Sequence, residues 1–401
     1  MKGKIKVSIV IIEVLIALGI LAVPLFWVQK IARAASTGKA MMAYREGAVD
    51  IPRYRIWTGS SWSAEAVALD VVGDTNWAVL RSCPKRNEKV LGVLDHLSDV
   101  NVQVWNGTTE TWGNLLTDAT TNTGTPAKRA FDIAYEQSSG DAIVVFSVDS
   151  NQPQYYSWNG SAWGTVAESA VAVGDATADI EWVGLASKPG ADEIIMVTQD
   201  TLLDIYAQVW DGSAWGNAVN LTTATEIADK QCFDVAYEQS RKRAMVVYTT
   251  LDNNTPKYSM WDTIDLWVAG GSATPTATAG DDLRWVKLAA RLGSNELLLG
   301  VSDDAYDLNV QLWYSGASET WSNATTEVIG GTLKSLPTLD FRCFNVAYES
   351  TSGEGMVVWS DDDETAEYCN WDGSSWSGGS TAMSATATYS VAWVALASNP
   401  D

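Results

Sequence analysis

Histidine is almost absent from this chain, since His96 is the only one in 401 residues. A single histidine cannot complete a serine–histidine–aspartate triad or a histidine-rich zinc site. The common hydrolase and zinc-enzyme classes therefore have no support, although a membrane-anchored hydrolase propeller is the enzyme-class alternative. We predict that the protein is not an enzyme, that it has no catalytic residue, and that His96 lies in a surface turn.

Cysteine is also scarce, and its spacing carries no motif. The four residues are Cys83, Cys232, Cys343 and Cys369. No pair has the CxxC spacing of a metal or redox site. Cys343 and Cys369 fall on the first and third strands of one predicted unit, too far apart for a disulfide. We predict mostly free thiols.

Basic charge is the third shortage, with 26 Lys and Arg against 49 Asp and Glu. The first 35 residues hold five basic residues and one acidic residue, which leaves 21 basic and 48 acidic residues and a net charge of −27 for the remainder. Such a surface excludes a nucleic-acid partner, which would need basic stripes. The acidic clusters at 281–282, 303–304 and 361–364 lack the alternating ligands of a calcium loop, so we predict no metal and no cofactor.

Tryptophan, in contrast, is abundant and periodic. Seven tryptophans recur at intervals of 48 to 58 residues, and each is followed within five to eight residues by a second one. A period near 50 residues in units of short strands is typical of a repeat architecture. The leading tryptophans are Trp57, Trp105, Trp158, Trp210, Trp261, Trp313 and Trp371.

Each repeat predicts four antiparallel strands, the make-up of a propeller blade. In residues 182–216, strand-like runs begin at Trp182, Ile194 and Tyr206, and a fourth begins at Trp215. An Asn-Gly or Asp-Gly pair lies between the two tryptophans in four units, which is a strong hairpin signal and suits a type I′ turn. These pairs are Asn106-Gly107, Asn159-Gly160, Asp211-Gly212 and Asp372-Gly373.

The first strand of the repeat alternates between two sequences, which indicates duplication of a pair of blades. One reads Trp-x-x-Leu and begins at Trp77, Trp182, Trp285 and Trp393; the other reads Phe-x-x-Ala-Tyr-Glu and begins at Phe131, Phe233 and Phe344. The chain stops just after a first strand, and residues 38–57 match a second and a third strand. We therefore predict an all-β seven-bladed propeller over residues 36–401, closed by N- and C-terminal strands that share one blade.

The paired tryptophans allow two interpretations. Aromatic faces around a turn can stack on sugars, whereas repeated tryptophans at matched positions commonly pack blade against blade. The candidate ligand-binding or packing residues are Trp57, Trp105, Trp158, Trp210, Trp313 and Trp371. Five asparagines begin N-x-Ser/Thr sequons and are candidate glycosylation sites: Asn106, Asn159, Asn220, Asn253 and Asn323.

The N-terminus differs from the rest of the chain. Lys2, Lys4 and Lys6 precede an apolar run from Val7 to Val28, and only Glu13 places a charge within it. A run of this length spans a membrane, with the lysines on the cytoplasmic side. A carboxylate inside such a helix is costly and is usually functional.

This pattern resembles the N-terminus of type IV pilins and pseudopilins. The resemblance implies cleavage of the leader 1–8 by a prepilin peptidase after Ser8, so that Ile9 becomes the first residue and Glu13 the fifth. The family usually has Gly before the cut and Phe or Met after it, so this chain departs at both positions. In a filament, Glu13 would pair with the Ile9 amine of a neighbouring subunit. Gly19 and Pro24 would weaken the helix.

The predicted function combines the two parts. Residues 9–35 form a hydrophobic polymerisation or transmembrane helix, and the acidic propeller is displayed outside a type IV pilus-like filament. The partners are other copies of the chain in a helical homopolymer, the prepilin peptidase and pilus assembly machinery, and the membrane before assembly. The alternative is a minor tip subunit, adhesin or membrane-anchored surface propeller that binds glycans. An uncleaved signal anchor also fits residues 1–35.

Overall fold

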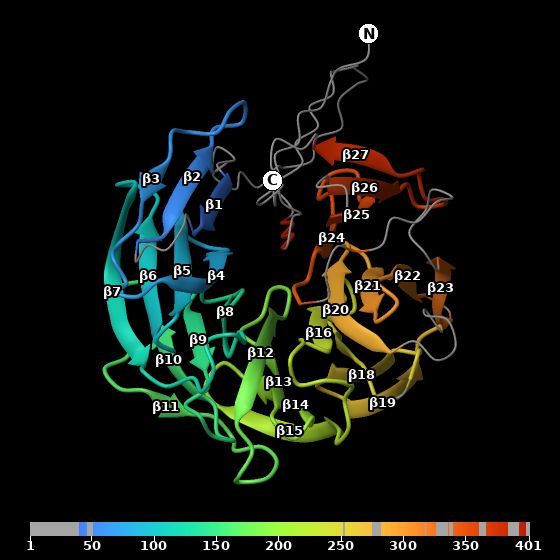
Figure 1. Ribbon diagram of the computed structural model, residues 1–401, viewed down its shortest axis with the longest axis horizontal. Coiled ribbons are helices and arrows are strands. Elements are labelled where there is room, and N and C mark those ends of the chain that lie inside the picture. The colour runs from blue at the N-terminus through green and yellow to red at the C-terminus, as the bar shows by residue number, and fades with distance from the viewer. Residues whose placement is uncertain are drawn as a thin grey trace, which may run out of the picture.

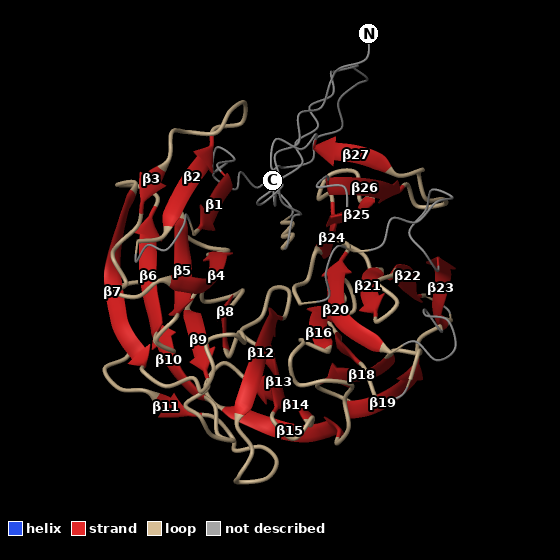
Figure 2. Cartoon of the chain, viewed as in Figure 1, coloured by secondary structure: helices blue, strands red, loops and turns tan. Residues whose placement is uncertain are grey.

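The computed structural model describes residues 40–45, 51–251, 253–274, 282–316, 318–325, 336, 340–360, 366–383 and 393–397. Within these ranges the regular structure is all strand (Figure 2). The predicted helix at 9–35 and the leader at 1–8 lie outside them, as do Ser8, Ile9, Glu13, Gly19 and Pro24. Nowhere in the described ranges is there a helix with the length and apolar character needed to cross a membrane.

Seven antiparallel sheets stand around a common centre, which makes the molecule a seven-bladed propeller (Figure 1). Each sheet is a meander in which consecutive strands pair. We number the sheets as blades in chain order. Blade 1 holds β1 (Ala40–Tyr44), β2 (Arg53–Trp57) and β3 (Ala66–Val67). Blade 2 holds β4 (Thr75–Ser82), β5 (Glu88–Asp95), β6 (Val100–Asn106) and β7 (Thr111–Thr120). Blade 3 holds β8 (Phe131–Tyr135), β9 (Ala142–Phe146), β10 (Gln154–Trp158) and β11 (Glu168–Ser169).

The remaining four blades repeat this pattern with four strands each. Blade 4 holds β12 (Ile180–Ser187), β13 (Ile194–Asp200), β14 (Ile205–Trp210) and β15 (Trp215–Thr222). Blade 5 holds β16 (Phe233–Tyr237), β17 (Ala244–Tyr248), β18 (Lys257–Asp262) and β19 (Leu266–Ser272). Blade 6 holds β20 (Leu283–Ala290), β21 (Leu297–Asp303), β22 (Leu308–Ser315) and β23 (Glu319–Thr325). Blade 7 holds β24 (Phe344–Tyr348), β25 (Gly355–Ser360), β26 (Ala366–Trp371) and β27 (Ser380–Met383).

Burial decreases from the centre of the ring to its rim. Every residue of β8 and β9 is buried, whereas most of β19 is exposed. Inner strands are covered on both faces by neighbouring blades, so they are almost continuously apolar, and rim strands are covered less. The core consequently lies between blades, and one buried cluster joins residues of blades 4 to 7.

The hairpin turns between the paired tryptophans differ from the predicted type I′ turn. In blade 4 the Trp210–Trp215 pair closes a four-residue loop, with the Asp211 amide donating to the Ala214 carbonyl at 3.1 Å. Gly212 has a φ of 98°, but Asp211 is not in the left-handed region. Asp211 instead accepts the amides of two following residues through Oδ1. The dipeptide marked the turn correctly, because glycine supplies the single positive φ and the aspartate carboxylate caps the loop.

The C-terminal segment 393–397 lies against blades 7 and 2. The Val394 amide donates to the Arg342 carbonyl at 3.3 Å, and the Trp393 ring centroid lies 5.0 Å from that of Trp77. Blade 1 has three described strands, so its completion by a C-terminal strand stays a prediction.

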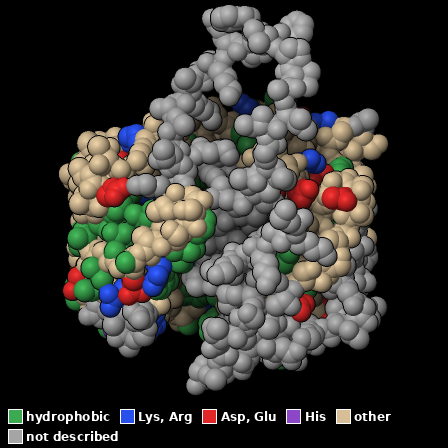
Figure 3. All heavy atoms as spheres, turned by 90° about the horizontal axis from the view of Figure 1, so that it is seen from above, with side chains coloured by type: hydrophobic (Ala, Val, Ile, Leu, Met, Phe, Trp, Pro, Cys, Tyr) green, Lys and Arg blue, Asp and Glu red, His purple; other side chains and the backbone are tan. Residues whose placement is uncertain are grey.

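The described surface mixes charges of both signs. Seen from above in Figure 3, acidic and basic side chains lie interspersed among apolar and neutral atoms, and no continuous basic stripe is visible on the described part of this face. This agrees with the strongly acidic composition.

Candidate functional site

The leading tryptophan of the pair is a buried packing residue in blades 2 to 7. Trp158, Trp313 and Trp371 are no more than 2% exposed, and Trp105 and Trp210 are also buried. Trp57 in blade 1 is half-buried. Because their faces are covered, the buried five have no open face on which a sugar could stack. Of the two interpretations, the structure supports blade packing at these positions.

The indole N–H groups of four leading tryptophans each bond to a glutamate of the preceding blade. Trp158 in blade 3 donates to Glu88 Oε1 in blade 2 at 3.0 Å. The same bond joins Trp210 to Glu136 at 2.6 Å, Trp261 to Glu193 at 3.1 Å and Trp313 to Glu238 at 2.8 Å. A buried carboxylate and a buried indole N–H each need a partner, so each bond satisfies both groups at a seam.

The seams fall into two classes that alternate around the ring. In seams 2/3, 4/5 and 6/7 the glutamate accepts a tyrosine hydroxyl from the first strand of the next blade, and we call these the tyrosine–glutamate seams. At seams 2/3 and 4/5 the same glutamate accepts the indole N–H, whereas the buried Trp371 N–H at seam 6/7 has no hydrogen-bond partner among the described residues. The bonds run from Tyr135 to Glu88 at 3.1 Å, from Tyr237 to Glu193 at 2.9 Å and from Tyr348 to Glu296 at 2.9 Å.

In seams 1/2, 3/4 and 5/6 a tyrosine contributes its ring instead, and we call these the tyrosine–tryptophan seams. The ring of Tyr155 lies 5.5 Å from that of Trp210 and 6.2 Å from that of Trp215. Such tilted and edge-on contacts add to the burial of the aromatic surface. The corresponding tyrosines are Tyr54 on Trp105 and Trp112, and Tyr258 on Trp313 and Trp321.

A cation accompanies the glutamate in every tyrosine–glutamate seam. Arg86 bonds to Glu88 at 3.0 Å, Lys188 to Glu193 at 3.1 Å and Arg291 to Glu296 at 3.5 Å. The environment raises the pKa of the Tyr135 hydroxyl, first through burial and then through the adjacent Glu88 carboxylate. Tyr135 therefore stays neutral and serves as a hydrogen-bond donor at physiological pH.

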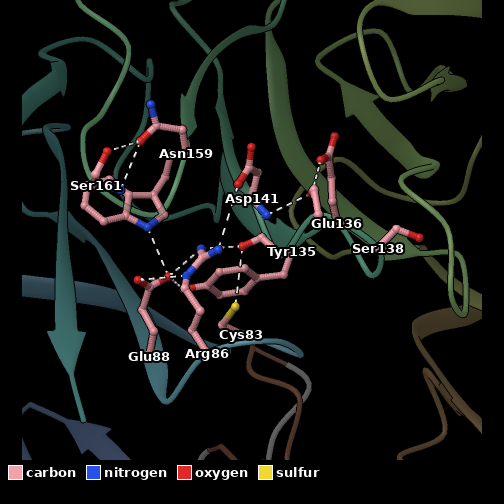
Figure 4. A network of polar contacts seen from close by, with 12 residues as sticks. Cys83, Arg86, Glu88, Tyr135, Glu136, Ser138, Asp141, Asn159 and Ser161 are labelled. Carbon is pink, nitrogen blue, oxygen red and sulfur yellow. Dashed lines mark hydrogen bonds and ion pairs between the residues drawn. The ribbon is translucent and has the colours of Figure 1, made fainter. Parts of the chain in front are cut away.

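At the mouth of seam 2/3, the half-buried Arg86 lies among Glu88, Tyr135 and Asp141 (Figure 4). Its Nη2 donates to the Gly140 carbonyl at 2.5 Å, and its Nη1 lies 4.0 Å from Asp141 Oδ1. Gly160 packs so closely that a Cβ there would lie 2.9 Å from the guanidinium carbon. About a third of the Arg86 side chain and 40% of that of Asp141 remain exposed. The mouth thus presents a donor and an acceptor at fixed positions.

Seam 6/7 repeats this arrangement with different residues. Arg291 takes the place of Arg86, and a Cβ at Gly353 would lie 2.6 Å from its Nε. Glu354 follows Gly353 just as Asp141 follows Gly140. In seam 4/5 the corresponding residues are Lys188 and Arg243, and Arg243 is paired with Glu238 at 2.9 Å. A half-buried arginine, and an acidic residue directly after the turn glycine, are therefore shared by seams 2/3 and 6/7.

The second tryptophans lie nearer the rim and are less covered. Trp163 and Trp267 are half-buried, and their indole N–H groups donate to the backbone carbonyls of Asn114 at 2.9 Å and Asn217 at 2.7 Å in the preceding blades. Both asparagines have a positive φ, which turns these carbonyls toward the seam. These aromatic side chains are the more accessible members of the repeat.

The predicted sequon residues have different environments. Asn106 and Asn159 are exposed at turns, where each caps two following amides, and Asn220 is exposed on β15. Asn253 is half-buried and accepts the Thr255 amide at 2.9 Å. Asn323 lies in β23. Access for modification is therefore best at Asn106, Asn159 and Asn220.

The remaining candidate groups show no reactive arrangement. His96 is exposed, and its Nδ1 accepts the Asp74 amide at 3.1 Å. All four cysteines are buried and free, as predicted. Within the described ranges, no three metal-ligating side chains come together.

No function was predicted from the sequence for the glutamates at the seams, although they recur in it. Glu136 and Glu238 end the Phe-x-x-Ala-Tyr-Glu strands, and Glu88, Glu193 and Glu296 occupy the corresponding hairpins of the other blades. Their repetition was a usable signal, since the glutamate lies 17 residues before the leading tryptophan in one type of unit and 22 or 23 residues before it in the other. Their pairing with the following blade required the three-dimensional arrangement.

Comparison with known proteins gives a likeness of fold. No family model and no curated protein sequence matches the chain. The crystal structure of the BP39L lectin from Burkholderia pseudomallei superposes with a TM-score of 0.63 at 11% identity, over 86% of this chain and 96% of the lectin. The chain has the seven-bladed propeller fold, and this structural neighbour is a lectin.

Two further lectins match more loosely. The six-bladed fucose-binding lectin of Aleuria aurantia has a TM-score of 0.43 at 11% identity, over 73% of this chain and 96% of its own. The SapL1 lectin, solved with alpha methyl fucoside, has a TM-score of 0.42 at 15% identity, over 77% and 97%.

Proposed function

We propose that the propeller is a glycan-binding domain displayed at the cell surface, with binding sites at the mouths of seams 2/3 and 6/7. The observation that carries the proposal is the partly exposed pair of Arg86 and Asp141 at seam 2/3, whose positions are occupied by Arg291 and Glu354 at seam 6/7. The fold likeness to the BP39L lectin supports the same class of function. The chain needs no catalytic group for this role.

The geometry suits hydroxyl groups. Arg86 Nη1 and Asp141 Oδ1 lie 4.0 Å apart, so adjacent hydroxyls of one sugar could accept from the guanidinium and donate to the carboxylate. The arginine is held from below by Glu88, which limits the rotamer freedom lost on binding. We infer a preference for sugars with vicinal hydroxyls.

Two sites on one propeller would raise the apparent affinity for clustered glycans. Linked sites convert the second binding event into an intramolecular one. Because the two seams belong to different blades, the ligands would be engaged on separate branches or chains. A surface bearing many copies of the glycan is the target that this arrangement favours.

The decisive experiment is a glycan array probed with the full-length chain in mild detergent, followed by titration calorimetry with the best ligand. The double variant Asp141→Asn, Glu354→Gln should lose at least tenfold in affinity, since each site loses a charge-assisted hydrogen bond. Both carboxylates lie near the surface, so the fold should be retained.

The matched control is Arg241→Gln, which alters an exposed arginine at the rim of seam 5/6. It should bind glycan as the unaltered chain does. A blank array, or a double variant that binds with full affinity, would refute the assignment of these seams.

For the mode of display, we propose the type IV pilus-like filament, with residues 9–35 as the polymerising helix. The support is the spacing of Lys2, Lys4, Lys6 and Glu13 in an apolar run. Intact and N-terminal mass spectrometry of the protein from the cell surface tests this point. A chain beginning at Ile9 supports filament assembly, and one beginning at Met1 favours a membrane-anchored propeller, with glycan binding unaffected.

A further inference from the structure

Four tryptophan rings close a circuit among the inner strands. Neighbouring centroids lie 5.8 Å apart for Trp77–Trp182, 5.5 Å for Trp182–Trp285, 6.0 Å for Trp285–Trp393 and 5.0 Å for Trp393–Trp77. All four contacts are edge-on, with interplanar angles of 78° to 88°. Three of the rings come from β4, β12 and β20, which line the centre of the propeller (Figure 1), and the fourth comes from the segment 393–397.

Charged side chains gather beside this circuit. Asp132 is buried on β8 and bonds to Arg81 at 2.9 Å and to Arg129 at 3.3 Å. The two arginines hold the pKa of Asp132 below its usual value, although burial opposes them. Both of its oxygens are also used by backbone amides, those of Ile133 and Leu185. Asp132 is therefore fully engaged.

The corresponding aspartate of blade 5 is engaged in the same way. Asp234 Oδ2 accepts from Lys287 Nζ at 2.6 Å and from the Leu288 amide at 2.8 Å. The pKa of Lys287 is lowered, first by burial, and further by the charges of Arg342 and Arg81. These three cations thus lie within one another's electrostatic field.

Arg342 is the cation with the fewest partners. Its guanidinium carbon lies 4.7 Å from the centroid of the Trp393 ring, and it is only 8% exposed. Its Nε is buried and has no hydrogen-bond partner among the described groups. Burial lowers the pKa of Arg342 to about 10, and Arg129 and Arg81 act in the same direction, so it stays charged at neutral pH.

In blade 7 the position of Asp132 and Asp234 is occupied by Asn345, which is neutral. Among the described residues that interact here, the four cations Arg81, Arg129, Lys287 and Arg342 face two carboxylates, an excess of two positive charges. Uncompensated buried charge is strongly unfavourable. The chain as a whole has a net charge of −23, so this excess is a local arrangement.

We propose that the centre of the propeller binds one small oxyanion, held by the Arg342 guanidinium beside the four-tryptophan circuit. Arg129 and Arg81, whose guanidinium nitrogens already donate to protein groups, add positive charge to the site. Arginine forks match planar carboxylates and tetrahedral sulfate or phosphate. The Arg81 side chain is 42% exposed, which leaves the cluster open to solvent on its side. The site is separate from the seam mouths and independent of the glycan proposal.

The test is titration calorimetry and thermal unfolding of the full-length chain with sulfate, phosphate and glucuronate, each below about 10 mM and at ionic strength matched with sodium chloride. One oxyanion per chain should bind, and the midpoint of unfolding should rise by about 1–4 °C at saturating ligand. The response to glucuronate relative to sulfate tells whether a carboxylate sugar or an inorganic anion is preferred.

The variant Arg342→Gln should weaken oxyanion binding at least tenfold, and Arg342→Lys, which keeps the charge but loses the fork, should retain part of it. Arg241→Gln is the control and should respond fully. If the unaltered chain binds no oxyanion beyond the chloride reference, or if Arg342→Gln responds as strongly as the control, the proposal is wrong. Binding of an oxyanion by the unaltered chain is measured without any variant, so this part of the test holds even if Arg342→Gln folds poorly.

Discussion

The two classes of seam solve one packing problem in different ways. In a tyrosine–glutamate seam, Glu88 is the acceptor for an indole, a phenol and a guanidinium. In the tyrosine–tryptophan seam 3/4, Glu136 serves Trp210 and the Ser139 hydroxyl, and the Tyr155 ring adds apolar contact. Seam 2/3 thus concentrates polar bonds on one carboxylate, and seam 3/4 spreads its contacts over aromatic surface. In the first class, seams 2/3 and 6/7 bring a half-buried arginine and an acidic residue to the mouth of the seam, whereas in the second class the exposed Arg241 pairs with Glu319 at 2.9 Å at the rim of seam 5/6.

The largest difference should appear when the central carboxylate is removed. Glu88→Ala leaves the Trp158 indole, the Tyr135 hydroxyl and Arg86 without this acceptor, and we expect a loss of about 3–5 kcal/mol in the free energy of unfolding. Glu136→Ala leaves two neutral donors and should cost about 1–3 kcal/mol. Urea unfolding of both variants measures the difference. Equal losses would remove the distinction between the classes.

A second contrast lies between blade 4 and blade 6, at the ends of their second strands. Asp200 and Asp303 end β13 and β21, and each caps two amides through Oδ1. Asp303 Oδ2 accepts a hydrogen bond from the side-chain amide of Asn309 at 2.9 Å, whereas Asp200 Oδ2 is buried and has no hydrogen-bond partner among the described residues. Burial raises the pKa of Asp200 to about 6, with the nearby Asp204 and Glu181 adding to the shift.

This shift predicts a pH dependence of stability. A carboxyl whose pKa is raised on folding favours the folded state when protonated, so its contribution is complete below about pH 4 and is lost as the pH rises through about 6. We expect a decline of about 1–3 kcal/mol over this range. Asp200→Asn should flatten the profile there, as measured by urea unfolding at several pH values. If the free energy of unfolding of Asp200→Asn still falls with pH as steeply as in the unaltered chain, a group other than Asp200 causes the dependence.

The smallest predicted effect compares two tyrosine hydroxyls. Tyr135→Phe removes a buried bond to Glu88 and should cost about 0.5–1.5 kcal/mol. Tyr155→Phe removes a 3.1 Å bond to the exposed Glu168 but keeps the ring against Trp210, so its cost should stay below about 0.5 kcal/mol. Thermal unfolding of the pair sharpens the distinction between polar and aromatic seams. A larger loss for Tyr155→Phe would reverse it.

Much of the fold followed from the repeat, because each unit carries its own strands, turns and tryptophans in order. The alternation of Trp182-type and Phe233-type strands also predicted paired blades, and the seams alternate accordingly. The candidate sites were harder to predict, because a seam joins Glu88 to Trp158 across 70 residues. The charge imbalance around Arg342 depends on side chains from several blades. No local pattern records either arrangement.

The circuit of four tryptophans has a consequence for the symmetry of the ring. The two types of first strand can alternate without interruption only in a ring with an even number of blades. This ring has seven blades, so two neighbouring blades must carry the same type. Trp393 and Trp77 meet where the late and early parts of the chain come together, and their centroids are the closest in the circuit. If the C-terminal segment completes blade 1, as the sequence predicts, these two residues mark the like neighbours. Rotation by two blades therefore fails to map the molecule onto itself. The centre of the propeller therefore lacks rotational symmetry, and a ligand or neighbouring subunit that contacts it can bind in one preferred orientation.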